Sequence, residues 1–303
     1  MKGEKLFINQ FALKIIALLT MTSSHIGYMM ITGGYFAVDS PGYMAAMILQ
    51  YIGRLAFPLF AFMLAEGMRK THDRLNYIMR LGLMCLAIIL VQTAMFLIDK
   101  DMAGTMEGNA FLDLIVAALF IYLLEHPNKW LRPLAILPFG YVLLCYAMDI
   151  SEIYASNNNA ISVWSSFYPS FLRCSYNLYG FLIIVSFYFA LPLAKRVLKM
   201  MTGGDEEMYG VVATESKLQG FSNAISALFL VVINLIFWAL IKFGLPDPYY
   251  MEAQSYAAIA AVLIIFYNGK RGYNAKWWKI FTYLYYPVHL VLIWGIFVLC
   301  FMH

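Results

Sequence analysis

Residues 220–241 read GFSNAISALFLVVINLIFWALI and contain no charged side chain. An α-helix of this length crosses the hydrocarbon core of a bilayer, which is about 30 Å thick. Apolar blocks of similar length recur along the whole chain. Because backbone amides in lipid must be satisfied within their own segment, these blocks predict helices rather than short alternating strands. The sequence therefore predicts an all-α, polytopic transmembrane helical bundle.

The composition of the 303-residue chain is typical of a protein in lipid. Hydrophobic residues make up 62% of it and charged residues 13%, whereas soluble domains are about half apolar and a quarter charged. The mean hydropathy is +0.71. The four cysteines have no spacing that indicates a disulfide framework or a zinc site. We therefore expect no metal centre.

Windows of about 19 residues divide the chain into nine predicted membrane-spanning helices. These spans cover residues 8–31, 44–66, 77–98, 109–125, 133–149, 171–192, 220–241, 250–267 and 279–301. We expect residues 1–303 to form a single transmembrane domain, in which residues 200–220 are a flexible cytoplasmic loop.

The charges of the connecting loops predict the orientation of the bundle. Every second loop is rich in Lys and Arg, beginning with Lys2 and Lys5 before the first span, and the alternate loops are mainly acidic. Because basic residues accumulate on the cytoplasmic side, the N-terminus is predicted to be cytoplasmic and His303 to lie outside. The net charge of +4 belongs to these inner loops, so we expect no nucleic-acid partner.

Two histidines lie deep within predicted spans, where ionisable groups are costly and usually have a function. His25 lies in the outer half of the first span, and His289 lies about 15 Å into the last span, next to Pro287. A neutral imidazole can accept a proton near neutral pH, as a general base must. The alternative for His25 is a hydrogen bond that merely joins two helices.

Arg54 lies near the middle of the second span, beside Pro58. A guanidinium cannot lose its charge at this depth, so it must bind an anionic ligand, face a wet cavity or pair with a carboxylate. Asp113 and Asp149 are the carboxylates considered for such a pair. The proline is expected to kink the helix and so to open space for a cavity.

Three motifs occur in order along the chain: Leu13-Lys14-Ile15-Ile16-Ala17-Leu18 running to Ser24-His25-Ile26-Gly27, then Gly53-Arg54-Leu55-Ala56-Phe57-Pro58-Leu59-Phe60-Ala61-Phe62, and finally Tyr286-Pro287-Val288-His289-Leu290. Together they resemble the TraX family of bacterial membrane acetyltransferases, which is distantly similar to transmembrane acyltransferases that use acetyl-CoA. In this chain Ser24 replaces the acidic residue that usually precedes the first-helix histidine.

The resemblance implies a multi-pass protein of the bacterial inner membrane that moves an acetyl group from cytosolic acetyl-CoA to an amine or hydroxyl. The acceptor would be a protein N-terminus or a cell-surface glycan. On this interpretation His25 is the general base or carries the acetyl group itself, and Arg54 or a tyrosine hydroxyl stabilises the oxyanion. His289 is the next candidate for the base.

Five basic residues near the predicted inner face are expected to hold the phosphates of acyl-CoA. They are Lys14, Arg69, Lys70, Lys270 and Arg271. For Lys14 the alternative is a side chain that snorkels to the inner interface.

Two other functions remain open on the sequence alone. A transporter or flippase for an anionic lipid or polymer would use Arg54 as its substrate site and the histidines as a proton relay. A non-catalytic scaffold would use its polar residues only for helix packing. Movement of the anionic lipid or polymer across the membrane without acetyl transfer would indicate the transporter and not the enzyme.

Overall fold

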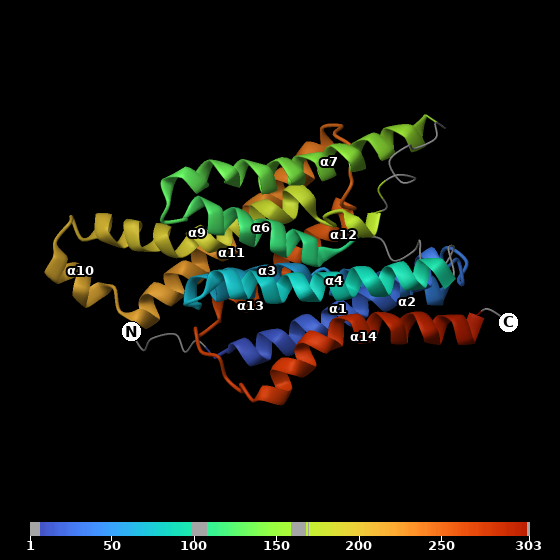
Figure 1. Ribbon diagram of the computed structural model, residues 1–303, viewed down its shortest axis with the longest axis horizontal. Helices are drawn as coiled ribbons and strands as arrows, with labels where there is room; N and C mark the ends of the chain where they lie inside the picture. The colour runs from blue at the N-terminus through green and yellow to red at the C-terminus, as the bar shows by residue number, and fades with distance from the viewer. Residues whose placement is uncertain (1–6, 99–107, 159–167, 169, 302–303) are drawn as a thin grey trace.

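The computed structural model describes residues 7–98, 108–158, 168 and 170–301. These residues form helices and contain no β-strand, which confirms the all-α prediction (Figure 1). The helices are α1 (Gln10–Thr32), α2 (Pro41–Gly53), α3 (Ala56–Lys70), α4 (Arg74–Ile98), α6 (Ala110–Leu124), η1 (Lys129–Ala135), α7 (Ile136–Asn157), η2 (Ser170–Leu172), α9 (Asn177–Met201), α10 (Glu206–Val212), α11 (Glu215–Lys242), α12 (Met251–Gln254), η3 (Ser255–Ile259), α13 (Ala260–Ile265) and α14 (Lys276–Phe301).

Seven helical stretches of the described chain are long and apolar enough to cross a membrane, so the predicted number of nine is wrong by this criterion. Two of these stretches join neighbouring elements, α2 with α3 and η1 with α7. The predicted spans 109–125 and 250–267 are only the shorter apolar helices Ala110–Leu124 and Met251–Ile265. A 15-residue α-helix is about 22 Å long, which is less than the hydrocarbon core.

Contacts with the region between α3 and α4 show where the two short helices end. Arg74, at the start of α4, forms an ion pair with Glu125, just after α6 (2.8 Å). Lys70, at the end of α3, donates to the Gly269 carbonyl, just after α13 (2.9 Å). The C-terminal ends of α6 and α13 are therefore neighbours of the connection between α3 and α4.

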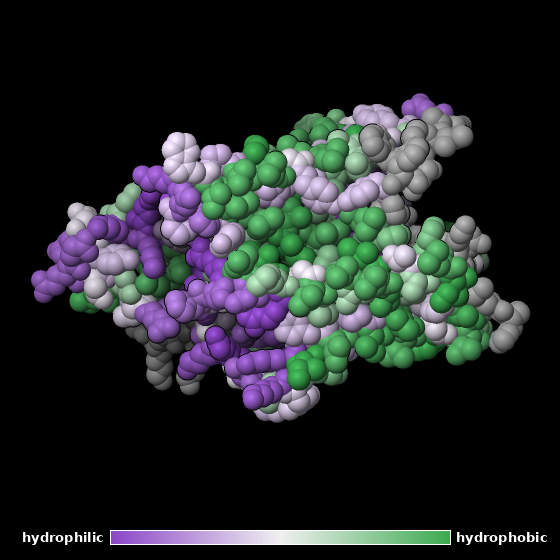
Figure 2. Space-filling model, viewed as in Figure 1, coloured by the Kyte–Doolittle hydropathy of each residue, from purple (hydrophilic) through white to green (hydrophobic). Residues whose placement is uncertain are grey.

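The polar loops gather at the end of the bundle where α1 begins. Figure 1 shows the start of α1, α10 and the α13–α14 connection at this end, whereas α14 ends at the opposite end. Figure 2 shows hydrophilic residues concentrated at the same end and hydrophobic residues over much of the remaining visible surface. By the rule that basic loops stay in the cytoplasm, this is the inner end. Lys2, Lys5 and His303 lie outside the described residues.

Residues 200–220, predicted as a loop, are mostly helical. The end of α9, all of α10 and the start of α11 lie in this segment. Asp205 caps α10 by accepting backbone N–H groups of Glu207 (2.9 Å) and Met208 (3.1 Å). The glycine-rich and acidic composition that suggested a loop therefore supplies a turn and a helix N-cap.

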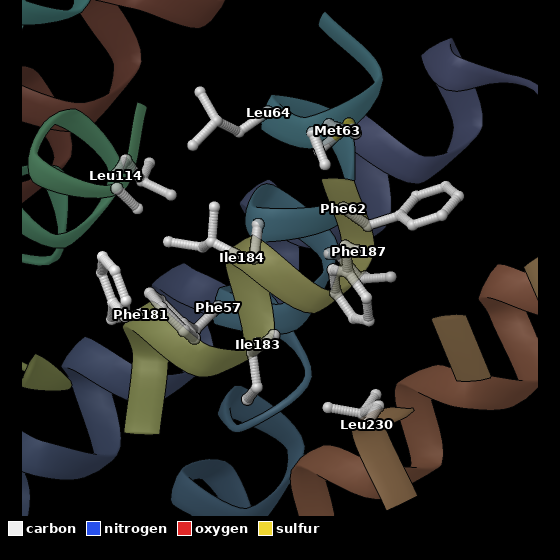
Figure 3. Packing of buried hydrophobic residues seen from close by; sticks show 14 of the residues in the cluster. Phe57, Phe62, Met63, Leu64, Leu114, Phe181, Ile183, Ile184, Phe187 and Leu230 are labelled. Carbon is white, nitrogen blue, oxygen red and sulfur yellow. The ribbon is translucent and has the colours of Figure 1, made fainter. Parts of the chain in front are cut away.

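The core is centred on α9, which packs between α3, α6 and α11. Ile183, Ile184 and Phe187 of α9 are completely buried. Figure 3 shows Phe187 beside Phe62 of α3, and the two rings meet edge to face with centroids 5.7 Å apart. Leu230 closes the α11 side of this cluster. This packing fixes α3, and with it the residues at the α2–α3 junction.

The predicted break in the second span is present. Helix α2 ends at Gly53 and α3 begins at Ala56. Pro58 has no N–H to donate to the Arg54 carbonyl, which accounts for the break at this position. As a result Arg54 lies between two helices rather than within one.

Candidate functional site

Two histidines from opposite ends of the chain form a hydrogen-bonded pair. Nδ1 of His25 on α1 lies 2.8 Å from Nε2 of His289 on α14. Nδ1 of His289 lies 3.0 Å from the Tyr285 carbonyl oxygen, which can only accept a hydrogen bond, so this nitrogen carries the proton. In the neutral pair His25 Nδ1–H therefore donates to His289 Nε2. His25 Nε2 is left with a lone pair that can accept a proton.

Aromatic residues of α14 fix the orientation of the histidine pair. The Tyr285 ring stacks on His289 with centroids 5.2 Å apart, and its hydroxyl lies 2.7 Å from Thr22 Oγ1 on α1. The Tyr286 ring meets the His25 ring edge to face at 6.0 Å. These contacts also join α14 to α1, so the two helices that carry the pair are held together beside it.

Close packing of α2 on α1 positions His25 from the other side. A Cβ on Gly53 would lie 2.3 Å from the Ser24 Cβ, and a Cβ on Gly27 would lie 2.6 Å from the Ala46 carbonyl oxygen. Real Cβ atoms are not found this close to other heavy atoms, so both positions require glycine. Residue 25 lies between these two contacts on α1.

Arg54 is held by neutral partners. Its Nη2 donates to Gln50 Oε1 (2.6 Å) and its Nη1 donates to Gln254 Oε1 (3.3 Å). Among the residues that the structure describes, Arg54 forms no ion pair with a carboxylate. The guanidinium therefore keeps an uncompensated positive charge.

The two carboxylates considered as partners of Arg54 bond elsewhere. Asp113 accepts backbone N–H groups of Ser175 (2.8 Å) and Tyr176 (3.1 Å) at the start of α9. Asp149 accepts from Arg173 Nη1 (2.9 Å), and Arg173 also binds Glu152 (3.0 Å). The predicted alternative of a structural Arg54–carboxylate pair is therefore wrong within the described chain.

Two cavities meet at His25. The larger has a volume of about 620 Å³ and is lined by the outer parts of α1, α2, α4, α7 and α14 and by residues around 170–176 and 248–250. The smaller has a volume of about 70 Å³ and extends inward between α1, α3 and α6. Both cavities are lined by Ser24, His25, Ala110, Tyr176 and Tyr286. His25 is thus accessible from two sides.

The two cavities differ in chemistry. Arg54, Asp149, Glu152 and Arg173 all line the larger one. The smaller one contains mainly apolar side chains, which are Met21, Ala56, Phe57, Phe60, Phe111 and Leu114. The larger cavity suits a polar ligand from outside, and the smaller one suits a compact apolar group.

The basic residues predicted to bind phosphates do not form one site. Lys270 and Arg271 are exposed in the loop after α13, and the positive charge of Lys14 is repelled by that of Lys279 on α14. Lys70 is half exposed and forms an ion pair with buried Glu66 (2.6 Å). These residues lie at the inner end of the bundle, where an anionic donor would arrive.

Arg69 is part of the core instead. It pairs with Glu66, and its Nη1 donates to the carbonyl oxygens of Phe187 (2.6 Å) and Tyr188 (3.0 Å). Pro192 cannot donate to the Tyr188 carbonyl four residues earlier, so Arg69 replaces the missing helical hydrogen bond. Its role as a phosphate ligand therefore finds no support.

Sequence reasoning missed the two glutamines that orient Arg54. Gln50 precedes Arg54 by four residues, a spacing that places two helical side chains on the same face, so this partner could have been found. Gln254 is distant in sequence and only the fold brings it near. The described residues contain no group of three metal-binding side chains.

The model of one protein family, described as TraX protein, matches residues 10–202 of the chain, which is more than half of it. The matched region contains His25 and Arg54, whereas His289 lies beyond it. No curated protein and no solved structure matches the chain.

Proposed function

This chain belongs to the TraX family, and we propose that it is a membrane acetyltransferase that moves an acetyl group from cytosolic acetyl-CoA to an amine or hydroxyl acceptor. The acceptor is a protein N-terminus or a cell-surface glycan, and the protein acts in the bacterial inner membrane. The observation that carries the proposal is the His25–His289 pair at the junction of two cavities.

The acceptor enters the larger cavity from the outer side. This cavity is polar and is large enough for the end of a peptide or a sugar. The lone pair on His25 Nε2 takes the proton of the amine or hydroxyl as this group attacks. His289 holds the base in the required tautomer, as the second residue of a catalytic triad does.

The donor arrives from the inner side. Lys14, Lys70, Lys270 and Arg271 attract the phosphates of acetyl-CoA at the inner end of the bundle. Lys14 and His25 are about 16 Å apart along α1, so an extended pantetheine arm is needed to bring the thioester to the histidine. The smaller cavity accepts the acetyl group between Phe60 and His25.

The chemical step is an acyl transfer. The acceptor nitrogen or oxygen bonds to the thioester carbonyl carbon, the carbon–sulfur bond breaks, and the departing thiolate takes the proton held by His25. Tyr176 or Tyr286, which both line the two cavities, donates to the oxyanion. A route through an acetylated His25 uses the same groups in two steps.

The proposal is tested with protein purified in lipid nanodiscs, labelled acetyl-CoA and a mixture of peptide and sugar acceptors. We expect transfer by the unmodified protein and a loss of about 10²–10⁴-fold in His25→Ala. His72→Ala, in the exposed loop between α3 and α4, is the matched control and should keep full activity. Normal transfer by His25→Ala would contradict the proposed base, and flux of an anion without transfer would favour a transporter.

A further inference from the structure

The Arg54 side chain is organised by a chain of neutral hydrogen bonds. Gln254 is completely buried, and its Nε2 donates to the Tyr179 hydroxyl (3.4 Å), which donates to Asn234 Oδ1 (3.1 Å). Because the Gln254 amide nitrogen is used in this way, its oxygen is fixed toward Arg54. The guanidinium is therefore held in place without being neutralised.

The carboxylates of the same cavity bind another arginine and not Arg54. Asp149 and Glu152 both bind Arg173, whose side chain is only 3% exposed. Asp149 also accepts from the Asn177 amide (2.7 Å). Both carboxylates are thus bound to the same arginine, and within the described residues neither forms an ion pair with Arg54.

Some of the donor groups of Arg54 remain unused by protein. A guanidinium has five N–H donors; the glutamines take two of them, and the Tyr176 hydroxyl also interacts with the guanidinium. The buried Nε atom has no hydrogen-bond partner in the described chain. A buried donor of a charged group without a partner is costly unless a ligand binds it.

We propose that Arg54 binds an anionic group, a carboxylate or a phosphate, that the acceptor carries near its reacting amine or hydroxyl. The inference rests on the proposed function, because it concerns the acceptor of that reaction. Arg54 lines the larger cavity and is absent from the lining of the smaller one. It therefore faces the acceptor rather than the thioester, and it selects the substrate instead of stabilising the oxyanion.

A change of charge at one of the two glutamines tests the anion site. A glutamate at position 50 would have the same shape as Gln50, would lie at the same 2.6 Å from Nη2 and would neutralise Arg54. Gln50→Glu should therefore abolish anion binding without altering the shape of the cavity. Asn158→Asp makes the same amide-to-acid change at an exposed position after α7, outside the cavity lining, and serves as the matched control.

The binding experiment uses benzoate and benzamide, which have the same shape but differ in charge. Tyrosines 28, 176, 249, 250 and 286 line the larger cavity and would accept the ring of either probe. In phosphatidylcholine nanodiscs we expect the unmodified protein and Asn158→Asp to bind benzoate about tenfold more tightly than benzamide. Gln50→Glu and Arg54→Gln should bind both probes equally. Equal binding by the unmodified protein, or an unchanged preference in Gln50→Glu, would overturn the anion site.

Two further arms separate this inference from the proposed function. If benzoate binding behaves as expected while no acceptor is acetylated, the anion site stands and the acetyltransferase proposal fails. If acetylation proceeds equally well with a peptide and with its neutral, carboxyl-amidated analogue, the acetyltransferase stands and the role of Arg54 in acceptor selection is wrong. Displacement of benzoate by phosphatidylglycerol in the nanodisc would assign the site to a lipid headgroup and overturn its assignment to the acceptor.

Discussion

Gly53→Ala tests whether the close contact between α1 and α2 positions the histidine pair. The added Cβ would lie 2.3 Å from the Ser24 Cβ and 2.6 Å from the Ser24 Cα. Carbon atoms in contact are about 3.5–4.0 Å apart, so the two helices would have to separate by more than about 1 Å. Because one of the crowded atoms belongs to the backbone, a change of side-chain rotamer cannot relieve the contact.

The expected effect of this separation has two parts. Overpacking of a well-packed interface costs about 1–3 kcal/mol of stability. His25 directly follows Ser24, so the same movement displaces the base, and a displacement of about 1 Å in an active site can lower the rate about 10²-fold. The variant should therefore lose both stability and transfer activity.

Gly140→Ala in α7 and Gly295→Ala in α14 are the controls, because a Cβ at either position meets no atom within 4 Å. All three changes share the gain in helix propensity, which is up to about 1 kcal/mol. Unfolding would be followed by titration with a denaturing detergent in mixed micelles, and transfer would be measured on the same preparations. If Gly53→Ala matched the two controls in both measurements, the argument that this contact positions the site would be refuted.

Three further predictions concern other parts of the molecule. The side chain in His289→Gln can still accept a hydrogen bond from His25, so this variant should retain most of the transfer rate. His289→Leu cannot accept one and should lose at least about 10²-fold. If His289→Leu transferred as fast as the unmodified protein, the pair would have no catalytic role. Arg69→Leu should destabilise the protein by about 3–5 kcal/mol, since it breaks a buried ion pair. Lys70→Leu, at a half-exposed position, should destabilise it by less than about 1 kcal/mol. If Lys70→Leu were the less stable variant in detergent unfolding, the argument from burial would be contradicted. A reporter fused after His303 should be extracytoplasmic, and a cytoplasmic signal would mean that one short helix does not cross.

The helical class and the presence of a cavity beside the deep histidines could be anticipated because both follow from the cost of polar groups in lipid, whereas the contact between the two histidines was not predicted. His25 and His289 are ionisable groups that the sequence places in apolar segments. Such groups seek one another or a cavity, and the structure brings both together at a cavity wall. The lengths of the membrane-spanning helices were predicted less well, since α6 is apolar but ends after 15 residues. Hydropathy windows measure composition and not where a helix stops.

The partners of the arginines could not be predicted in the same way. A deep arginine suggests a carboxylate partner, but Arg54 is oriented by two amides, one of them far away in the sequence. Arg69 is basic and close to a predicted inner loop, which suggested phosphate binding. Its ion-pair partner Glu66 lies three residues earlier on the same helix and could have been found from the spacing. The carbonyl partners lie on another helix, where Pro192 leaves one carbonyl without a donor, and no local pattern around Arg69 contains that information.

Protonation of the histidine pair would place a second positive charge in the cavity that contains Arg54. When His25 takes a proton, an imidazolium forms in a cavity that already contains the guanidinium, and the two like charges repel each other. The hydrogen-bonded pair contains no carboxylate that could offset this, and the residue before His25 is Ser24. An anionic group of the acceptor bound at Arg54 would remove the repulsion before the proton moves. An acceptor without that group should therefore show both a higher KM and a lower kcat, since it loses binding energy and also transition-state stabilisation.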